Sequence, residues 1–477
     1  MRWVLFLGAL LGCGGMTSGA APAIADPPLV MSALTKCRTC HGQAGPGPEI
    51  NRSAAPALSG LIADRVRSGN MPPWMPGPLS EPFTGDYWLT DAERTALLAW
   101  ASAGGHLAAE IPDPAKAAYP SGPVVARLMM TAGYVPPPPP VGDEYRCFVL
   151  PWAGPSAAMS AYRWSLGNPK ATHHVTGLVV SAAGAARATT RQGKDGRPGF
   201  NCIALPADLD IVADLGASGV GPGGGQVFPD GVGAVIPAGG AVVMQLHYTG
   251  PSSAGDVSGI EIWTAPASAS VKPLRQWALW APVELPCPTG VSQDPRNRCS
   301  REWAIGNGVI QTPSDVRAQA DYLLSSCGQT LAGKLAAVEF TKTVPDKWLS
   351  PSGCDGVFPE NGALRAIHGH MHTQGASIRV EVQESGHWRV LLDIPRWRWW
   401  WERAYTFAAP IPIKAGQMVR VSCQHDNGSQ VQWSASTHTP GTDSRAELPL
   451  EDPAYVVMGF ERKNEMCEVF LAYTKDN

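Results

Sequence analysis

The stretch AVIPAGGAVVMQLHY, residues 234–248, contains the pattern that decides the fold class of this chain. Two short apolar runs, at 234–236 and 242–246, flank the turn sequence Pro-Ala-Gly-Gly. Apolar runs of strand length that end at Gly or Pro are typical of β-strands. The same pattern recurs at 175–180 and 378–382, whereas helical periodicity is sparse and is clearest at 314–327. We therefore predict an all-β body from residue 144 onward, built as two β-sandwiches.

The bulk composition agrees with a globular, turn-rich protein. The chain has 477 residues, of which 44% are apolar and 16% are charged. This length allows two or three domains with full cores. The 52 glycines and 45 prolines favour a β fold over a helical one. With 37 Lys and Arg residues against 40 Asp and Glu, the net charge is -3 and no basic run occurs, so we expect no nucleic-acid partner.

The first 25 residues read as an export signal, with Arg2 before a short apolar core at 4–11. Two cleavage positions compete. The small-x-small sequence 23–25 precedes Asp26, whereas the sequence LLGC ending at Cys13 resembles a lipobox that would add a lipid anchor. In either case we expect an exported protein, periplasmic or on the cell surface, in an oxidising compartment where cysteines pair.

The sequence Cys37-Arg-Thr-Cys40-His41 is the attachment pattern of a c-type haem. Two thiols at this spacing reach the two haem vinyl groups, and the adjacent imidazole of His41 ligates the iron. The second axial ligand is expected in the Pro-rich segment 70–76, where Met71 is the first choice and Met75 the rival. A thioether ligand raises the reduction potential relative to a second imidazole.

This front segment resembles a class I cytochrome c over residues 28–106, with Met71 in the place of the axial methionine of small bacterial cytochromes c. A capping box formed by Thr90 and Glu93 begins a helix, and the glycines at 104–105 end it. Five prolines at 136–140 then stiffen the chain. We therefore predict a small all-α domain at 26–106 and a Pro-rich linker at 107–143.

Two groups of side chains in the body offer metal ligands. The first group holds three imidazoles, and the second holds two imidazoles and a thioether: His173, His174 and His247, then His370, His372 and Met466. Imidazole and thioether ligands together select copper that cycles through Cu(I) over zinc, calcium or magnesium. The sequence therefore predicts a protein with two copper ions.

The spacing of the histidines leaves two questions open. His370 and His372 alternate, so on a strand both rings face the same side, but His368 shares that side. His173 and His174 would face opposite sides of a regular strand. Both can bind one metal only if the backbone bends there or if one ring ligates through its other nitrogen.

Together these residues resemble the copper type II, ascorbate-dependent monooxygenases, the family of peptidylglycine α-hydroxylating monooxygenase and dopamine β-monooxygenase. The resemblance covers residues 144–475 and rests on the order and spacing of four segments, which are HH at 173–174, QLHY at 245–248, HMHTQG at 370–375 and NEMC at 464–467. It implies two jelly-roll β-sandwich domains, at 144–272 and 273–477, with an open, solvent-filled cleft between them.

The resemblance also implies a role for each ligand group. An electron-transfer copper would bind His173, His174 and His247. An oxygen-binding copper would bind His370, His372 and Met466, which would carry catalysis. The distance to Gly375 favours His370 and His372 over His368 as this pair of ligands.

The cysteine count fits an exported framework of disulfides. Cys13 and the two haem cysteines leave eight, an even number. The resemblance favours a bridge between Cys423 and Cys467, which would fix the segment that carries Met466. Three further pairings complete the prediction: Cys147 with Cys202, Cys287 with Cys299, and Cys327 with Cys354.

Departures from the family pattern bear on the substrate. His368 stands where the peptide hydroxylase has an arginine that holds the substrate carboxylate, and Glu468 and Phe470 replace an asparagine and a tyrosine. Peptides ending in glycine are therefore not the expected substrate. Glu468 is interpreted as a solvated surface side chain, with contact to a cationic amine as the rival. The tryptophans at 397 and 399–401 form either an aromatic binding wall or sheet packing.

The predicted function is hydroxylation of an activated C–H bond of a small organic molecule with O2. Two electrons are consumed, and the haem would relay them singly from an external one-electron donor. The alternative is a non-enzymatic exported electron carrier or copper-handling protein on the same scaffold. A third interpretation, a haem-based sensor, predicts no copper.

Overall fold

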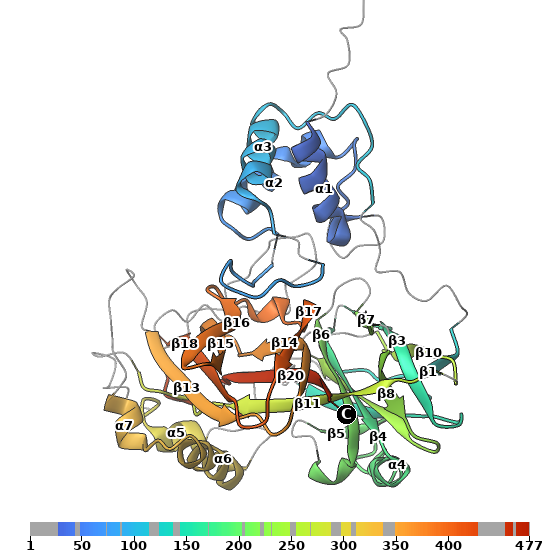
Figure 1. Ribbon diagram of the computed structural model, residues 1–477, viewed down its shortest axis with the longest axis vertical. Helices are drawn as coiled ribbons and strands as arrows, with labels where there is room; N and C mark the ends of the chain where they lie inside the picture. The colour runs from blue at the N-terminus through green and yellow to red at the C-terminus, as the bar shows by residue number, and fades with distance from the viewer. Residues whose placement is uncertain are drawn as a thin grey trace, which may run out of the picture.

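The computed structural model of the chain describes residues 27–42, 48–72, 74–85, 88–113, 124–136, 144–169, 171–202, 206–219, 224–229, 231–248, 254–267, 269–287, 297–306, 312–336, 349–427, 454–460 and 464–476. A cluster of three helices stands on a larger body made mainly of strands (Figure 1). The prediction of a mainly β chain is confirmed. The predicted export signal, with both cleavage positions, lies outside the described residues.

The three N-terminal helices share a core of their own. They are α1 (Pro28–His41), α2 (Ala55–Arg67) and α3 (Asp91–Ser102), and their core includes Leu34, Ile62, Leu97 and Trp100. The predicted capping box is confirmed, because Thr90 Oγ1 accepts from the backbone N–H of Glu93 at 3.1 Å and the Glu93 carboxylate accepts from Thr90 N–H at 2.8 Å. Two glycines with positive φ, at 104–105, follow the end of α3.

The first half of the body is a β-sandwich. Its elements are β1 (Ala126–Met129), β2 (Glu144–Pro151), β3 (Ala157–Ser165), β4 (Thr172–Val180), α4 (Ala182–Thr189), β5 (Phe200–Asn201), η1 (Ala207–Leu209), β6 (Ile211–Gly219), β7 (Gly225–Val227), β8 (Val232–Ile236), β9 (Ala241–Tyr248) and β10 (Gly259–Thr264). One sheet has the order β5-β2-β9-β4-β6, and the facing layer contains β1, β10, β3 and β8. Met159 and Ile236 from one layer pack with Val175 and Leu246 from the other.

The second half repeats this two-layer plan. Its elements are β11 (Lys272–Trp280), β12 (Glu284–Leu285), α5 (Arg301–Gly306), α6 (Pro313–Ser326), α7 (Leu331–Ala336), β13 (Leu349–Val357), β14 (Gly362–His370), β15 (Gly375–Glu384), β16 (His387–Ile394), η2 (Trp399–Trp401), β17 (Tyr405–Ile413), β18 (Met418–Asp426), β19 (Val456–Val457) and β20 (Glu468–Lys475). The sheet β13-β18-β15-β16 faces β11, β20, β14 and β17. Leu364 and Leu471 pack with Val380 and Val421 between the layers, and α6 confirms the helix predicted at 314–327.

A single sheet runs through both halves of the body. Strand β11 pairs in parallel with β8 through Lys272–Val232 and Pro273–Gly233, and in antiparallel with β20. The resulting order is β1-β10-β3-β8-β11-β20-β14-β17. The predicted domain boundary between residues 272 and 273 lies at this joint, so the two sandwiches are connected side by side by backbone hydrogen bonds.

The segment predicted as a linker, 107–143, contains described residues that pack against both neighbouring parts of the chain. At its start, Leu107 and Ile111 belong to the core of the helical cluster. Further along, β1 pairs with β10, and Tyr134 exchanges backbone hydrogen bonds with Asp256. Strand β1 is thereby the edge strand of the first sandwich. Most of the proline run, 137–140, lies outside the described residues.

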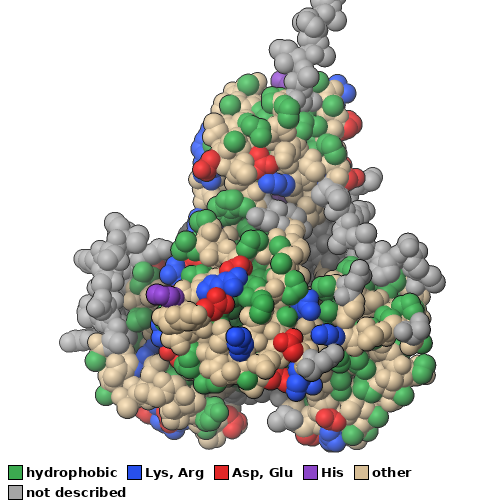
Figure 2. All heavy atoms as spheres, viewed as in Figure 1, with side chains coloured by type: hydrophobic (Ala, Val, Ile, Leu, Met, Phe, Trp, Pro, Cys, Tyr) green, Lys and Arg blue, Asp and Glu red, His purple; other side chains and the backbone are tan. Residues whose placement is uncertain are grey.

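All four predicted disulfides are confirmed: Cys147–Cys202, Cys287–Cys299, Cys327–Cys354 and Cys423–Cys467. Disulfides of this kind are typical of proteins that fold in an oxidising compartment. Among the described helices, none has the length and apolar character needed to cross a membrane. On the face drawn in Figure 2, basic and acidic side chains of the described residues lie interspersed.

Candidate metal centre

The first histidine group lies on two neighbouring strands of the first sandwich. Strand β4 is irregular at this point: Thr172 pairs with Tyr248 and His174 with His247, so His173 is an extra residue on its strand. Such a bulge breaks the regular alternation of side chains. The backbone therefore departs from a regular strand at the doubled histidine, which is one of the two arrangements that would let both rings bind one metal. The side chain of His173 lies outside what the structure describes.

His174 and His247 are buried next to each other, with ring centroids 4.8 Å apart. Tyr145 of β2 lies opposite His247 in the sheet and stacks on its ring, with centroids 3.9 Å apart and planes 12° apart. The stacking fixes the plane of the His247 ring. Two imidazoles of the predicted electron-transfer site are thus brought together.

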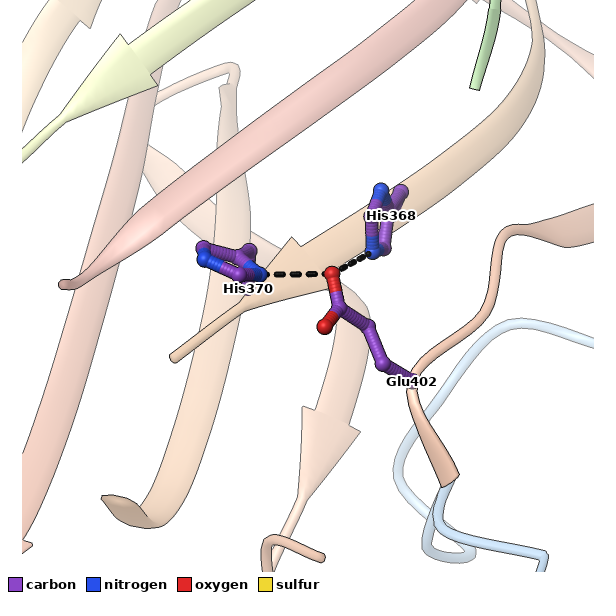
Figure 3. Close-up of side chains that lie close together, drawn as sticks. All are labelled: His368, His370 and Glu402. Carbon is purple, nitrogen blue, oxygen red and sulfur yellow. Dashed lines mark hydrogen bonds and ion pairs between the residues drawn. The ribbon is translucent and has the colours of Figure 1, made fainter. Parts of the chain in front are cut away.

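The second histidine group lies at the end of β14. His368 and His370 point from the same face of this strand toward the carboxylate of Glu402, which follows η2 (Figure 3). Oε1 of Glu402 is 2.5 Å from Nδ1 of His370 and 3.0 Å from Nε2 of His368. These three residues offer ligand atoms within 4.8 Å of one another. The prediction that His368 shares the face of His370 is confirmed.

His372 lies just beyond β14, and its ring is held from one side. Nδ1 is 2.9 Å from the carbonyl oxygen of Asn464. In addition, the carbonyl oxygen of His372 accepts from Nε1 of Trp397 at 3.1 Å. Metal-binding histidines usually donate one ring N–H to a carboxylate or carbonyl and present the other nitrogen to the metal. His370 and His372 both fit this arrangement, with Nε2 as the donor atom toward a metal.

Met466 is tied to His372 by a buried carboxylate. Glu465 accepts from the backbone N–H groups of His372 at 2.9 Å, Gln374 at 2.6 Å and Met466 at 3.0 Å. The carbonyl of Met466 is 3.2 Å from Nε2 of His425. Because Glu465 binds both segments, the predicted thioether and the predicted imidazole are fixed relative to each other.

One cavity unites the two histidine groups. Its volume is about 20 Å³, and it is lined by Tyr145, His174, His247, His370, Met371, His372, Thr373, Trp399 and Glu402. The two histidine groups, which were expected on either side of an open cleft, thus line one cavity of the described residues. Met466 is 3% exposed and belongs to the core of the second sandwich, and it is not among the residues that line the cavity.

Glu402 and His370 form a buried ion pair in the cavity wall. Burial favours the neutral form of Glu402, but the imidazoles of His370 and His368 outweigh it and hold the pKa of this carboxyl well below its usual range. Burial also lowers the pKa of His370, and the Glu402 carboxylate outweighs it and raises this pKa to about 9. A metal that binds Nε2 of His370 must therefore displace a proton.

The interpretation of Glu468 as a solvated surface side chain is wrong. It is 3% exposed, because it lies opposite His370 in the pairing of β14 with β20. Burial raises the pKa of its carboxyl to about 7. The ring of Phe470 stacks on His368, with centroids 5.6 Å apart. Both departures from the family pattern thus lie beside the second histidine group.

The tryptophans near residue 400 divide between the two roles considered for them. Trp399 lines the cavity, as an aromatic wall would. Trp397 is buried in the core of the second sandwich, and Trp401 packs against that core. The side chain of Trp400 lies outside the described ones.

The haem motif occupies the end of α1. Nδ1 of His41 is 2.9 Å from the carbonyl oxygen of Pro48, and Cys37 packs against the helical core. The side chain of Cys40 is not described. Met71 is 37% exposed, whereas Met75 is 4% exposed and its sulfur accepts from the backbone N–H of Arg398 at 3.2 Å. The sulfur of Met75 thus faces the body, which leaves Met71 as the candidate axial ligand.

Four residues around the ligands were given no role by the sequence. Glu402, Glu465 and His425 are acids or imidazoles that become buried beside the ligands through long-range packing, and Tyr145 is an aromatic residue in an ordinary strand. Only Glu465 was indicated by the sequence, through its position next to the predicted ligand Met466. Glu402 follows the tryptophan run at 399–401, and that run points to apolar packing rather than to a buried charge.

Comparisons with known proteins give no family for this chain. No family model and no curated protein matches the sequence. Among solved structures, allantoicase of Saccharomyces cerevisiae is 10% identical, with 59% of this chain and 75% of that chain covered and a TM-score of 0.16. A xanthan lyase of Paenibacillus is 10% identical, with 74% of this chain and 24% of that chain covered and a TM-score of 0.16. Likeness at this level indicates neither a shared fold nor a shared activity.

Proposed function

We propose that this protein is an exported copper-dependent monooxygenase that hydroxylates an activated C–H bond of a small organic substrate with O2. The proposal includes a finer fold: a class I cytochrome c domain followed by two jelly-roll sandwiches. The observation that carries it is the single cavity lined by His174 and His247 from one sandwich and His370 and His372 from the other. Clustered imidazoles in a cavity are a ligand set for copper.

The chain offers a fitting set of ligands for two copper ions. One would be held by His174 and His247 together with His173. The other would be held by His370 and His372 with Met466, and the Nδ1 atoms of both histidines already have partners in Glu402 and Asn464. Copper bound there would supply one-electron redox chemistry and the activation of O2.

The side chains around the ligands position them and restrict access. Glu402 orients His370, and Glu465 fixes the segment of Met466 against His372. Trp399 and Met371 form apolar parts of the cavity wall. Tyr145 keeps the ring of His247 in one plane.

The N-terminal residues fit a covalently bound haem. Cys37 and His41 lie within two turns at the end of α1, and the bond between Nδ1 of His41 and Pro48 leaves Nε2 for the iron. Met71 would be the second axial ligand. The haem would pass single electrons from an external donor to the copper ions. The four disulfides support export, and we extend this to a periplasmic or surface location, with a lipid on Cys13 as the rival to a soluble form.

The first experiment is quantitation of copper and haem in the purified protein, followed by O2 uptake and product analysis with small aromatic amines and phenethyl compounds. The proposal requires two copper ions, one haem and a hydroxylated product. His372→Ala should abolish product formation and leave the haem spectrum intact. Tyr322→Ala, an exposed change on α6, is the matched control and should hydroxylate like the parent.

One observation favours the alternative, an electron carrier or copper-handling protein. The thioether of Met466 is buried in the core and the cavity is small, as expected where a metal changes oxidation state without binding a substrate. Copper and haem in full amounts, with O2 uptake but no hydroxylated product from any substrate class, would replace the monooxygenase by this function. Haem without copper would point instead to the sensor.

A further inference from the structure

The segment that follows the candidate axial methionine, Met71, is docked on the second sandwich. Residues 74–85 cross the surface formed by β16 and β17 (Figure 1). The N–H of Gly77 donates to the carbonyl of Asp393 at 2.6 Å, and the N–H of Thr84 donates to the carbonyl of Thr406 at 2.8 Å. Backbone bonds of this kind fix the segment in register on the sandwich.

Apolar side chains seal the same contact. Trp74, Met75 and Phe83 are each at most 9% exposed and belong to the core of the second sandwich. Trp74 meets Tyr405 edge to face, with ring centroids 5.1 Å apart. The contact therefore forms part of the folded core rather than a loose encounter of two domains.

Arg398 joins this segment to the cavity wall. Its guanidinium donates to the carbonyl of Gly69 and, at 3.2 Å, to the carbonyl of Asn70, the residue before Met71. Its backbone N–H donates to the sulfur of Met75. Arg398 is 7% exposed, and a buried guanidinium held by several acceptors rarely changes its position.

On its other side Arg398 leads directly to the second histidine group. Trp399, the next residue, lines the cavity. The N–H of Trp401 donates to the carbonyl of Arg398 at 2.9 Å, and Glu402 follows with its contact to Nδ1 of His370. An unbroken series of covalent and hydrogen bonds thus runs from Asn70 to His370.

We propose that the contact of Asn70 with Arg398, which the docked segment holds in place, is the route by which haem electrons enter the cavity, and that they arrive at the His370–His372 site rather than at the His174–His247 site. The inference rests on the proposed function, because it takes one haem and two copper ions as given. In each event ferrous haem iron becomes ferric and one cupric ion at the His370–His372 site becomes cuprous. One electron moves, and no bond is made or broken.

The test follows haem oxidation in the holoprotein by stopped-flow mixing without O2 or substrate. Cupric protein receives one electron at the haem from a photochemical donor, and the decay of the ferrous haem band is recorded. His247→Ala should retain the fast decay, whereas His372→Ala should lose it. The reverse result, or the same result in both variants, would overturn the proposal. Copper content and product yield, measured on the same samples, report separately on the proposed function.

A second measurement tests the docking without reference to either metal. Hydrogen exchange at the amides of Gly77 and Thr84 reports how often the segment leaves the sandwich. Arg398→Ala should speed exchange at both amides by about tenfold, which corresponds to about 1.4 kcal/mol of docking free energy. Arg420→Ala removes an arginine that pairs with Asp355 on the same sandwich and should leave both amides unchanged. Rapid exchange at these amides in the parent protein would overturn the fixed interface.

Discussion

Replacing Glu402 by glutamine should change how copper affinity depends on pH. In the parent protein, the carboxylate raises the pKa of His370 to about 9, so copper competes with a proton below that pH. The affinity of this site should therefore rise about tenfold per pH unit until roughly pH 9 and then level off. Because pH 7 lies two units below this pKa, competition with the proton weakens copper binding there by roughly 100-fold.

Two effects of opposite sign follow in Glu402→Gln. Without the carboxylate, the largest contribution that raises the pKa of His370 is lost, so this pKa falls and proton competition at neutral pH weakens. The amide also orients the ring less firmly, and loss of such a partner typically weakens metal binding by about 10–100-fold. The effects offset each other near pH 7, whereas above about pH 9 only the weakening remains.

The assay is copper competition with a chelator of known affinity at intervals from roughly pH 6 to pH 10. A flatter profile for Glu402→Gln, lying below the parent profile at high pH, is the expected result. Glu360→Gln is the control, because that carboxylate pairs with Arg275 and Lys475 away from the cavity. Parallel profiles for the parent and the Glu402 variant would show that the carboxylate does not control the protonation of His370.

Three further variants test the second sandwich. Cys423→Ser opens a bridge across a sequence separation of 44, and the chain-entropy estimate for such a loop is a loss of about 4 kcal/mol in the free energy of unfolding, measurable with denaturant. Gly375→Ala places a Cβ 2.6 Å from the ring of Trp397 and should destabilise the fold by about 1–3 kcal/mol, seen as a lower Tm. Met466→Ala should lose one copper ion per chain by metal analysis and about 2–5 kcal/mol of stability.

Matched controls separate these effects from general damage. Met244→Ala removes a fully buried methionine from the core of the first sandwich. It should cost similar stability, about 2–5 kcal/mol, and keep both copper ions. If Met466→Ala also keeps both, its thioether is not a ligand. An unchanged denaturant midpoint for Cys423→Ser would contradict the chain-entropy argument. An unchanged Tm for Gly375→Ala would contradict the packing argument.

Local sequence patterns predicted the strands but not their partners. The runs at 234–236 and 242–246 both form strands, β8 and β9. The turn between them resembles that of a hairpin, yet β8 pairs with β3 and β11 while β9 pairs with β2 and β4. Apolar periodicity reports which face of a strand is buried, and it does not report which strand lies beside it. The assignment to opposite layers is settled by the packing of the whole sandwich.

The candidate site was predictable only where its residues are close in sequence. The spacing of His368 and His370 correctly predicted a shared face, and the irregularity of β4 is one of the two possibilities that the doubled histidine at 173–174 left open. Glu402 and Glu465 reach the site from distant segments. Carboxylates are mostly exposed in folded proteins, and no local sequence pattern indicates that these two are buried beside histidines.

The place of β20 in the sheet has a consequence for the order of assembly after export. This strand, Glu468–Lys475, lies between β11 and β14, which come much earlier in the chain. A chain that crosses a membrane from its N-terminus presents the strands of His174 and His247 first. The sheet of the second sandwich is complete only when β20 pairs with both β11 and β14, and pairings of such long range form slowly. Metal loading at the His370–His372 site should therefore be the last step of maturation.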